Sequence, residues 1–259
     1  MLRELDRAVE QLAGARRLLV VTGAGMSRDS GIPTFRDSLT GLWSKFDPQE
    51  LATEPAFRRN PARVFGWYLT RWRQVREVEP HPGYYALIRL AERLDRLTIA
   101  TQNVDGLHSR AGSSDVIELH GSLSAFRCID RGHRYEATNL EDITVPDDGV
   151  VEPPSCSDCG SPIRPGVVWF GEPLPGEAVE RAWSAVEQCD AMLVVGTSAL
   201  VYPAAELPEI ALSRDCPVIE INPTATPVTA SATAWLAERA AVALPTLVER
   251  LTATRTVVR

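Results

Sequence analysis

Residues 18–27 have the sequence LLVVTGAGMS, in which a run of branched apolar side chains leads directly into a loop with two glycines. The first four residues predict a short strand that is covered on both faces of a sheet. Gly23 and Gly25 fit the first two glycines of a dinucleotide-binding loop, although Arg28 stands at the position of the third. Glycine has no Cβ, so it lets backbone N–H groups approach a phosphate at the start of a helix. By itself, the stretch fits either a nucleotide-binding loop or a plain strand–helix turn.

Four more apolar runs along the chain end in the same manner. Each is short, rich in branched side chains and followed by small or polar residues; the runs are Leu97–Ala100, Val116–Leu119, Ala191–Val195 and Pro217–Ile221. Segments with helical periodicity alternate with these runs, which predicts an α/β fold with a parallel sheet. The carboxyl ends of parallel strands lie along one edge of such a sheet, where ligands bind. Five polar loops at that edge predict a long polar ligand.

Two regions interrupt this alternation. Residues 43–79 are rich in aromatic residues and arginines and are interpreted as helices inserted after the first strand. Residues 126–165 are rich in Cys, Pro, Gly and Asp and are interpreted as a small loop-rich module. A chain of 259 residues has the length of one large domain plus such a module. We expect residues 1–42, 80–125 and 166–259, approximately, to form the large domain, and residues 43–79 and 126–165 to form the small module.

The composition excludes several classes of protein. The 27 basic and 34 acidic residues give a net charge of −7, which lacks the basic character of a nucleic-acid-binding chain. No apolar run approaches the roughly 20 residues of a membrane span. Acidic residues Glu4, Asp6 and Glu10 precede the first apolar run, so a secretory signal is not expected. Five cysteines are an odd number for a disulfide framework, which favours a cytoplasmic protein with reduced thiols. From the net charge and the apolar runs, neither nucleic acid nor a membrane is expected as partner.

Longer motifs identify a family. In chain order, they are GAGMSRDSGIPTFR at 23–36, TQNVDGLH at 101–108, HG at 120–121, RPGVVWFGE at 164–172 and GTS at 196–198. Together they resemble the signature of the sirtuins, the NAD-dependent protein-lysine deacylases, over roughly residues 15–250. The resemblance implies one catalytic domain over residues 1–259, with a Rossmann-like parallel-sheet part and a smaller inserted module. That module would combine the helical insertion with a cysteine-containing, zinc-ribbon-like segment, and NAD and an acyl-lysine peptide would meet between the two parts.

The resemblance implies that His120 and Asn103 are the catalytic residues. In the family's reaction, the acyl oxygen of the modified lysine attacks C1′ of the nicotinamide ribose and expels nicotinamide. A general base then activates a ribose hydroxyl, and His120 corresponds to that base. Histidine suits the step because its unperturbed pKa of about 6.5 lets it accept a proton near neutral pH. The alternative is a core histidine with satisfied hydrogen bonds, but His120 directly precedes Gly121 at the carboxyl end of a predicted strand.

The same resemblance implies a set of NAD contacts. Asn103 and Asp105 would bind the ribose and the nicotinamide amide, although an Asn-Asp turn at a helix start would use the same residues. Phe35 would cover the nicotinamide end and Arg36 would lie near the phosphates. Ala240 would contact adenine, although Glu238 replaces a glycine of the family pattern. The full set is Gly23, Ala24, Gly25, Met26, Phe35, Arg36, Gln102, Asn103, Asp105, Gly196, Thr197, Ser198, Asn222 and Ala240.

Tyr68 and Arg71 are interpreted as determinants of the acyl group. They are three residues apart in a helical segment and therefore share a face. One class of sirtuins carries Tyr-x-x-Arg here and prefers succinyl and malonyl groups, because a buried carboxylate needs a charged partner such as a guanidinium. The alternative is that Arg71 belongs to a solvated basic face with Arg73 and Arg76. The other expected substrate contacts are Ala52, Val168, Phe170, Gly171 and Glu172.

The family's structural zinc site is altered in this chain. The pair Cys156 and Cys159 is intact, but Cys128 is followed three residues later by Arg131 instead of a cysteine. His133 could complete a Cys₃His set of ligands. Alternatively, Arg131 fills the site with its own charge and no metal binds. The sequence leaves both possibilities open.

The predicted function is that of an NAD-dependent protein-lysine deacylase, a desuccinylase and demalonylase with weaker deacetylase activity. The protein or peptide substrate would bind as an extra strand. The alternatives are a mono-ADP-ribosyltransferase or NAD hydrolase, and a non-catalytic sensor of NAD or ADP-ribose. Residues 80–84, with the sequence PHPGY, depart from the family's Pro-Asn-x-x-His pattern, and the sequence assigns them no function.

Overall fold

A six-stranded parallel sheet forms the centre of the larger part of the molecule. The computed structural model describes residues 2–32 and 48–256. The strand order is β3-β2-β1-β7-β8-β9, and every neighbouring pair is parallel. The strands are β1 (Arg17–Thr22), β2 (Arg96–Thr101), β3 (Val116–Glu118), β7 (Ala191–Val195), β8 (Val218–Ile221) and β9 (Ala234–Leu236). The predicted Rossmann-like α/β fold is therefore confirmed, and β9 is a strand that the sequence analysis missed.

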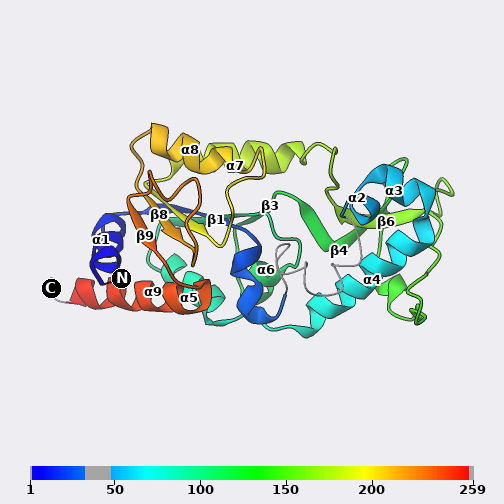
Figure 1. Cartoon of the computed structure of the whole chain (residues 1–259), viewed down its shortest axis with the longest axis horizontal. Helices are drawn as coiled ribbons and strands as arrows, with labels where there is room; N and C mark the ends of the chain where they lie inside the picture. The colour runs from blue at the N-terminus through cyan, green and yellow to red at the C-terminus, as the bar shows by residue number, and fades with distance from the viewer. Residues whose placement is uncertain (1, 33–47, 257–259) are drawn as a thin grey trace.

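Helices cover both faces of this sheet (Figure 1). One face carries α1 (Leu2–Leu12), α5 (Pro82–Ala91) and α9 (Ala240–Thr256), and the other carries α7 (Gly176–Gln188) and α8 (Glu206–Ser213). Successive residues of β1 serve the two faces in turn: Leu18 and Val20 belong to the core under α5 and α9, whereas Leu19 belongs to the core under α7 and α8. Covering on both faces explains why the strands are apolar throughout rather than alternating.

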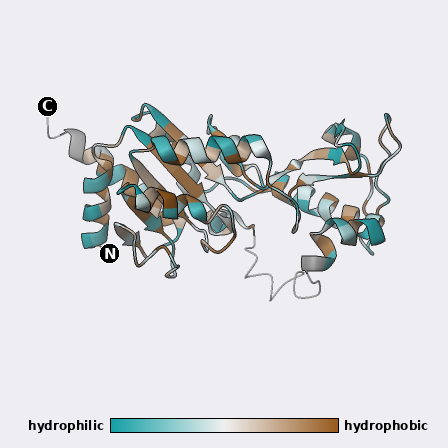
Figure 2. Cartoon of the chain, turned by 90° about the horizontal axis from the view of Figure 1, so that it is seen from above, coloured by the Kyte–Doolittle hydropathy of each residue, from teal (hydrophilic) through white to brown (hydrophobic). Residues whose placement is uncertain are grey.

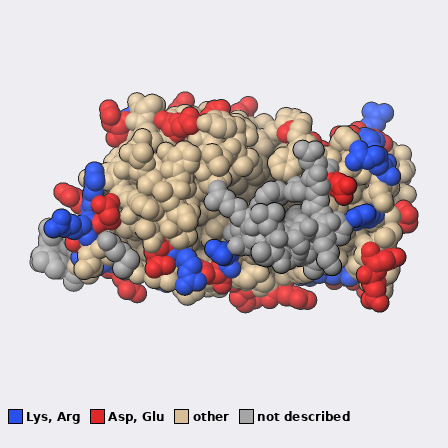
Figure 3. Space-filling view, in the orientation of Figure 1, with Lys and Arg blue, Asp and Glu red and all other residues tan. Residues whose placement is uncertain are grey.

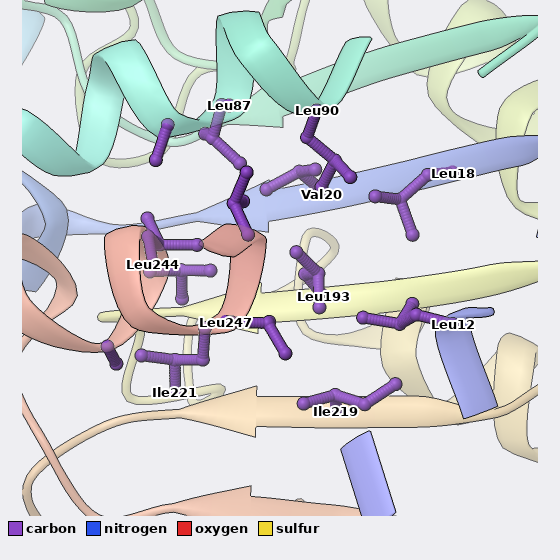
Figure 4. Packing of buried hydrophobic residues seen from close by; sticks show 14 of the residues in the cluster. Leu12, Leu18, Val20, Leu87, Leu90, Leu193, Ile219, Ile221, Leu244 and Leu247 are labelled. Atoms are coloured by element: carbon purple, nitrogen blue, oxygen red, sulfur yellow. The ribbon is translucent and has the colours of Figure 1, made fainter. Parts of the chain in front are cut away.

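The core under α5 and α9 shows how strands and helices interlock (Figure 4). Val20 of β1 and Leu193 of β7 point toward Leu87 of α5 and Leu244 of α9, and all four side chains are fully buried. Burying one such side chain contributes roughly 1.5–3 kcal/mol. This packing holds β1 and β7 as neighbours, and the strand order changes direction between them.

A second, three-stranded antiparallel sheet with the order β5-β4-β6 forms the other end of the molecule (Figures 1 and 2). Its strands are β4 (Gly121–Cys128), β5 (Arg134–Tyr135) and β6 (Ile163–Val167). Helices α2 (Pro48–Leu51), α3 (Glu54–Arg59) and α4 (Pro61–Glu77) lie beside this sheet, and a separate apolar cluster joins Phe65 and Trp72 of α4 to Phe126 and Ile163 of the sheet. The aromatic-rich and cysteine-containing regions, far apart in sequence, thus share one core. The domain boundaries at residues 43–79 and 126–165 stay a prediction.

Local sequence signals set the starts of the helices in this smaller part. The Asn60 side chain accepts a hydrogen bond from the Arg63 backbone N–H at 3.2 Å, and Pro61 occupies the first position of α4. Asparagine at the N-cap satisfies a free N–H group, and proline at the first position loses no hydrogen bond. Thr53 caps α3 in the same way, through the Ala56 N–H. The remaining short helices are α6 (Leu107–Ala111), η1 (Ala24–Met26), η2 (Arg28–Ser30) and η5 (Ala137–Leu140).

The charged side chains do not form a continuous basic surface on the face drawn in Figure 3. Among the described residues, arginine lies mainly at the rim of that face, interspersed with aspartate and glutamate, and uncharged residues fill the left-hand part of its centre (Figure 3). No helix within the described ranges 2–32 and 48–256 has the length and apolar character that crossing a membrane requires.

Gly66 of α4 provides a test of the packing between the helices and the loop at residue 149. A Cβ at this position would lie 2.1 Å from the Gly149 carbonyl oxygen and 3.0 Å from the Val151 nitrogen. In an open helix, Gly→Ala stabilises by about 1 kcal/mol, but overpacking costs about 1–3 kcal/mol. We therefore expect Gly66→Ala to lower the free energy of unfolding, measured by urea denaturation. Gly176→Ala in α7 is the control, because nothing lies within 4 Å of its Cβ position; a Gly66→Ala variant as stable as this control would contradict the packing.

Candidate active site

The loops that follow β1 and β7 touch backbone to backbone at the point where the strand order changes direction. The Gly25 N–H donates to the Gly196 carbonyl oxygen at 2.8 Å. A Cβ on Gly25 would lie 2.8 Å from the Gly196 Cα, and a Cβ on Gly23 would lie 2.8 Å from the Thr197 Cα. Gly196 has a φ of +60°, and its own Cβ would lie 2.4 Å from the Met26 nitrogen. These glycines therefore bring together two of the loops that the sequence assigned to NAD.

Asn103, Ser27 and Asp105 form a buried polar cluster under these loops. The Asn103 amide nitrogen donates to the Gly23 carbonyl at 3.0 Å and to Ser27 Oγ at 2.9 Å. Ser27 Oγ donates to one Asp105 oxygen at 2.6 Å, and the other oxygen accepts from the Leu107 N–H at 2.9 Å. Burial raises the pKa of Asp105, and the Ser27 hydrogen bond opposes that shift. Asp105 thus accepts the first N–H of α6, next to the N-cap residue Gly106, and is also a member of this cluster.

The unusual sequence at residues 80–84 supports the same cluster. Ser27 has one hydroxyl proton, which it gives to Asp105, so the Tyr84 hydroxyl must donate in its 2.9 Å contact with Ser27 Oγ. His81 accepts from the Gly83 N–H at Nδ1, which leaves Nε2–H to donate to the Met26 carbonyl at 2.6 Å. Helix α5 is thereby tied to the loop after β1. The sequence analysis noted that His81 and Tyr84 depart from the family's Pro-Asn-x-x-His pattern, but it missed their structural role.

His120 lies between β3 and β4 with its ring half-buried. Its Nδ1 is 3.0 Å from the Gln102 carbonyl oxygen, which can only accept a hydrogen bond. The neutral ring therefore carries its proton on Nδ1, and Nε2 keeps a free lone pair. Burial lowers the pKa of His120, while the hydrogen bond to Gln102 opposes that shift. The geometry is that of a neutral imidazole able to accept a proton.

Three of the edge loops meet at Thr197. The Gln102 amide donates to Thr197 Oγ1 at 3.0 Å, and the Asn222 amide donates to the Thr197 carbonyl oxygen at 2.8 Å. These bonds connect the loops after β2, β7 and β8. Ser198 follows directly and is partly buried, whereas Ala240 is buried at the start of α9 and packs near Gly83. Phe35 and Arg36 lie outside the described residues.

The residues expected to contact the acyl group lie on α4 and on the segment after β6. The Tyr68 hydroxyl accepts a hydrogen bond from the Trp169 indole N–H at 3.0 Å. Arg71 lies one turn further along α4, and partial burial lowers its pKa. The Phe170 N–H donates to the Ala52 carbonyl oxygen at 2.9 Å, which joins this segment to the chain before α3.

The remaining expected substrate contacts are placed as follows. The Val168 N–H donates to the His120 carbonyl oxygen at 2.8 Å, so Val168 lies next to the histidine. Phe170 is 57% exposed, and Gly171 has a φ of +87°. The Glu172 carboxylate is engaged within the protein: it forms an ion pair with Arg164 and accepts from the Trp169 N–H at 2.8 Å. Arg164 and Trp169 belong to the quoted motif at 164–172, but the sequence analysis gave neither a role.

A possible metal site lies at the far end of the smaller sheet. The ligand atoms of Cys128, His133, Cys156 and Cys159 all lie within 4.8 Å of one another. The Cys128 and Cys159 sulfurs are 3.7 Å apart, and His133 Nδ1 is 3.4 Å from the Cys156 sulfur. Zinc–sulfur bonds of about 2.3 Å in a tetrahedron place two sulfurs about 3.8 Å apart. The four residues thus fit a Cys₃His zinc site, whereas Arg131 is exposed.

Comparisons with known proteins agree with this geometry. The family model described as the Sir2 family matches residues 23–203. A Mycobacterium tuberculosis protein named NAD-dependent protein deacylase is 51% identical over 238 residues, which are 92% of this chain and 98% of the relative. A Pseudomonas aeruginosa protein named NAD-dependent protein deacylase 1 is 51% identical over 216 residues, which are 83% of this chain and 86% of the relative.

Solved structures show the same fold. A crystal structure of a Sir2 homologue in complex with NAD matches with a TM-score of 0.87 and 42% identity, covering 96% of this chain and 94% of that chain. The structure of Sir2Af2 bound to a myristoylated histone peptide matches with a TM-score of 0.79 and 34% identity, covering 99% of each. Since both the family match and the relatives span most of its length, the chain belongs to the Sir2 family, the sirtuins.

Proposed function

We propose that the protein is an NAD-dependent protein-lysine deacylase that acts on succinyl- and malonyl-lysine more efficiently than on acetyl-lysine. The relatives named as NAD-dependent deacylases and the neighbour with a bound acylated histone peptide support the general activity. The observation that carries the acyl preference is the pairing of Tyr68 with Arg71 on one face of α4, beside the segment at 168–172. A panel of matched acetyl-, succinyl- and malonyl-lysine peptides with NAD tests both parts.

The loops at the sheet edge fit a dinucleotide. When bound, NAD would supply the nicotinamide ribose, which loses nicotinamide at C1′ and receives the acyl group at a hydroxyl. Thr197 and Asn222 would hold its adenosine ribose and phosphates, and Asn103 and Asp105 its nicotinamide ribose and amide. The existing hydrogen bonds among Ser27, Asn103 and Asp105 fix these side chains before the ligand arrives, which lowers the entropic cost of binding.

His120 is proposed as the general base. Its hydrogen bond to the Gln102 carbonyl oxygen orients the ring and leaves Nε2 as the proton acceptor. Because burial lowers its pKa, the ring stays neutral at pH 7, which is the form that a base requires. The bond from the Val168 N–H to the His120 carbonyl oxygen keeps the base next to the segment that would bind the peptide.

Arg71 is proposed to bind the carboxylate of the acyl group. A carboxylate loses its hydration when it enters a partly apolar channel, and a guanidinium can replace that hydration with two parallel hydrogen bonds. Burial that lowers the pKa of Arg71 also means that this cation is poorly hydrated, so an anion nearby would stabilise it. An acetyl group carries no charge and gains nothing from this arrangement.

We also propose that Cys128, His133, Cys156 and Cys159 hold a structural zinc ion. Zinc in such a site has four protein ligands and contributes folding energy instead of catalysis. Its place at the end of β4, beside the loop before β6, would tie the two strands together. The ion would stabilise the smaller sheet, which packs against α4 in the same apolar cluster that holds Cys128 and Cys156.

Loss of the imidazole at position 120 tests the assignment of the base. We expect His120→Ala to lower kcat/KM by about 100-fold or more, as is typical for a general base. In the parent enzyme, kcat/KM should stay constant on acidification until the pH is below about 6.5, because the pKa of His120 is lowered in the folded protein. The residual activity of the variant should lack this acidic limb. A variant with the parent's rate and pH profile would contradict the assignment.

Removal of the guanidinium at position 71 tests the acyl preference. Arg71→Met should lower kcat/KM for succinyl-lysine by about 10- to 100-fold, which is the effect expected from the loss of a hydrogen bond to a charged group. Deacetylation should change less than about twofold, within the effect of a neutral surface substitution. Arg76→Met is the control, because Arg76 is an exposed cation on the same helix that pairs with Glu141. Equal loss of both activities in Arg71→Met would count against the proposal.

Metal analysis tests the zinc site. We expect one zinc per chain in the parent and none in Cys156→Ser. The Tm should fall by at least about 4 °C, since roughly 2 kcal/mol shifts the Tm of a chain of this size by 4–8 °C. Arg131→Ala should keep its zinc and its Tm, because the Arg131 side chain is exposed. Loss of stability in Arg131→Ala with no zinc in the parent would favour the charge-filled site instead.

A further inference from the structure

Trp169 is a buried residue that touches the proposed acyl pocket without belonging to the expected set of substrate contacts. Its side chain is 2% exposed, and its indole N–H donates to the Tyr68 hydroxyl oxygen at 3.0 Å. The two residues are 101 positions apart in the chain. Their rings lie 6.2 Å apart with planes inclined at 44°, so they meet at this hydrogen bond and do not stack.

The indole is held in place from several sides. The Arg164 guanidinium carbon lies 3.4 Å from the centre of the Trp169 ring, and the Phe57 ring lies 5.4 Å away. The backbone N–H of Trp169 donates to Glu172, whose carboxylate forms an ion pair with Arg164. The Arg164 side chain is only 3% exposed, so this pair is well shielded from solvent. The direction of the indole N–H is therefore set before any substrate binds.

This fixed donor determines the orientation of the Tyr68 hydroxyl. An indole N–H can only donate, so the Tyr68 oxygen must accept in this contact. The phenolic proton prefers the plane of its ring, where two positions are available, and the position nearer the indole is disfavoured because two donor hydrogens would then face each other. The proton must therefore point to the other side. Within the described residues, Tyr68 has no acceptor for that proton at hydrogen-bonding distance.

We propose that Trp169 is a positioning residue for acyl selection, because its indole N–H directs the Tyr68 hydroxyl proton into the acyl pocket. There the proton would be donated to the carboxylate of a succinyl or malonyl group, beside the guanidinium of Arg71. This inference rests on the proposed acyl preference. It adds that the preference depends on a residue outside the Tyr-x-x-Arg pair, which acts through Tyr68 and does not touch the carboxylate.

The charges around Tyr68 are compatible with this role. Burial raises the pKa of Tyr68, so the hydroxyl keeps its proton at neutral pH and well above it. The Arg164 cation is neutralised by Glu172 and does not compete with Arg71 for an acyl carboxylate. A protonated phenol and a guanidinium are then the two groups that face an incoming anion.

The experiment compares Trp169→Phe with the parent on succinyl- and acetyl-lysine peptides of one sequence. Phenylalanine keeps an aromatic ring but has no N–H, so the Tyr68 proton loses its imposed direction. We expect kcat/KM for the succinyl peptide to fall about fivefold, as for one ordinary hydrogen bond. The loss should appear in KM, because the carboxylate is remote from the reacting carbon. The kcat/KM for the acetyl peptide should stay within about twofold of the parent value. The control is Trp183→Phe in α7, for which kcat/KM on both peptides should stay within the same range.

A double-mutant cycle separates positioning from a general packing defect. Tyr68→Phe should itself lower desuccinylation, and adding Trp169→Phe to it should cause no further loss, since the hydroxyl is already absent. Replacement of Trp169 by benzothienylalanine removes the N–H with little change in shape and should reproduce the fivefold effect even where Trp169→Phe folds poorly.

The outcomes distinguish the two levels of the proposal. A parent enzyme with no preference for succinyl over acetyl peptides would overturn both the acyl preference and the role of Trp169. A parent with that preference, together with an unchanged succinyl-to-acetyl ratio in the Trp169→Phe and benzothienylalanine variants, would overturn the role of Trp169 alone. Equal losses on both peptides would also overturn it, because they would show a packing defect.

Discussion

The backbone contact between the loops after β1 and β7 is the constraint on which the site depends. The Gly25 N–H reaches the Gly196 carbonyl oxygen at 2.8 Å only because neither residue has a Cβ. The contact lies where the strand order changes direction, between two strands that the apolar core locks as neighbours. It therefore sets the position of Thr197 and of the Gly23 carbonyl oxygen to which the Asn103 amide donates. In an open parallel sheet, this is the place where a ligand is bound.

Below that contact, the polar groups of the site are paired in a defined direction. Tyr84 and Asn103 donate to Ser27, and Ser27 donates to Asp105. Each proton has one destination, so the cluster has little freedom to rearrange. Such a pre-ordered polar cluster contributes more to the free energy of ligand binding than flexible groups do, because its side chains lose their conformational entropy during folding and not during binding. The departures at positions 81 and 84 keep this cluster attached to α5.

The proposed acyl pocket depends on contacts between distant segments of the smaller part of the chain. Tyr68 belongs to α4, whereas Trp169 follows β6, and the apolar cluster that contains both also holds Phe57 and Phe126. The packing of this cluster places the two side chains within hydrogen-bonding distance. Acyl selection would then be a property of the small core and separate from the NAD-binding edge of the parallel sheet. This arrangement would allow the acyl preference to change without a change in the cofactor site.

Several features of the protein follow from short-range sequence alone. The five apolar runs predict β1, β2, β3, β7 and β8 because strands buried on both faces need branched apolar residues throughout. The shared face of Tyr68 and Arg71 follows from their helical spacing. Strand β9 was missed because three residues, Ala234–Leu236, are too few to show a periodicity. The ordered motifs were specific enough to indicate the family, which the comparisons then established.

Other features depend on contacts between residues that are far apart in the chain. The sequence indicates His120 as a candidate base, but it does not show that the Gln102 carbonyl oxygen lies beside the ring and determines which ring nitrogen is protonated. It contains His133 as one of several possible ligands, but only folding brings it to Cys156. Likewise, the direction of the Tyr68 hydroxyl depends on Trp169. Periodicity and spacing report interactions within a few residues, so the sequence determined the elements and the candidate residues. Proton positions and pairings arise from long-range packing, and only the tertiary structure decided them.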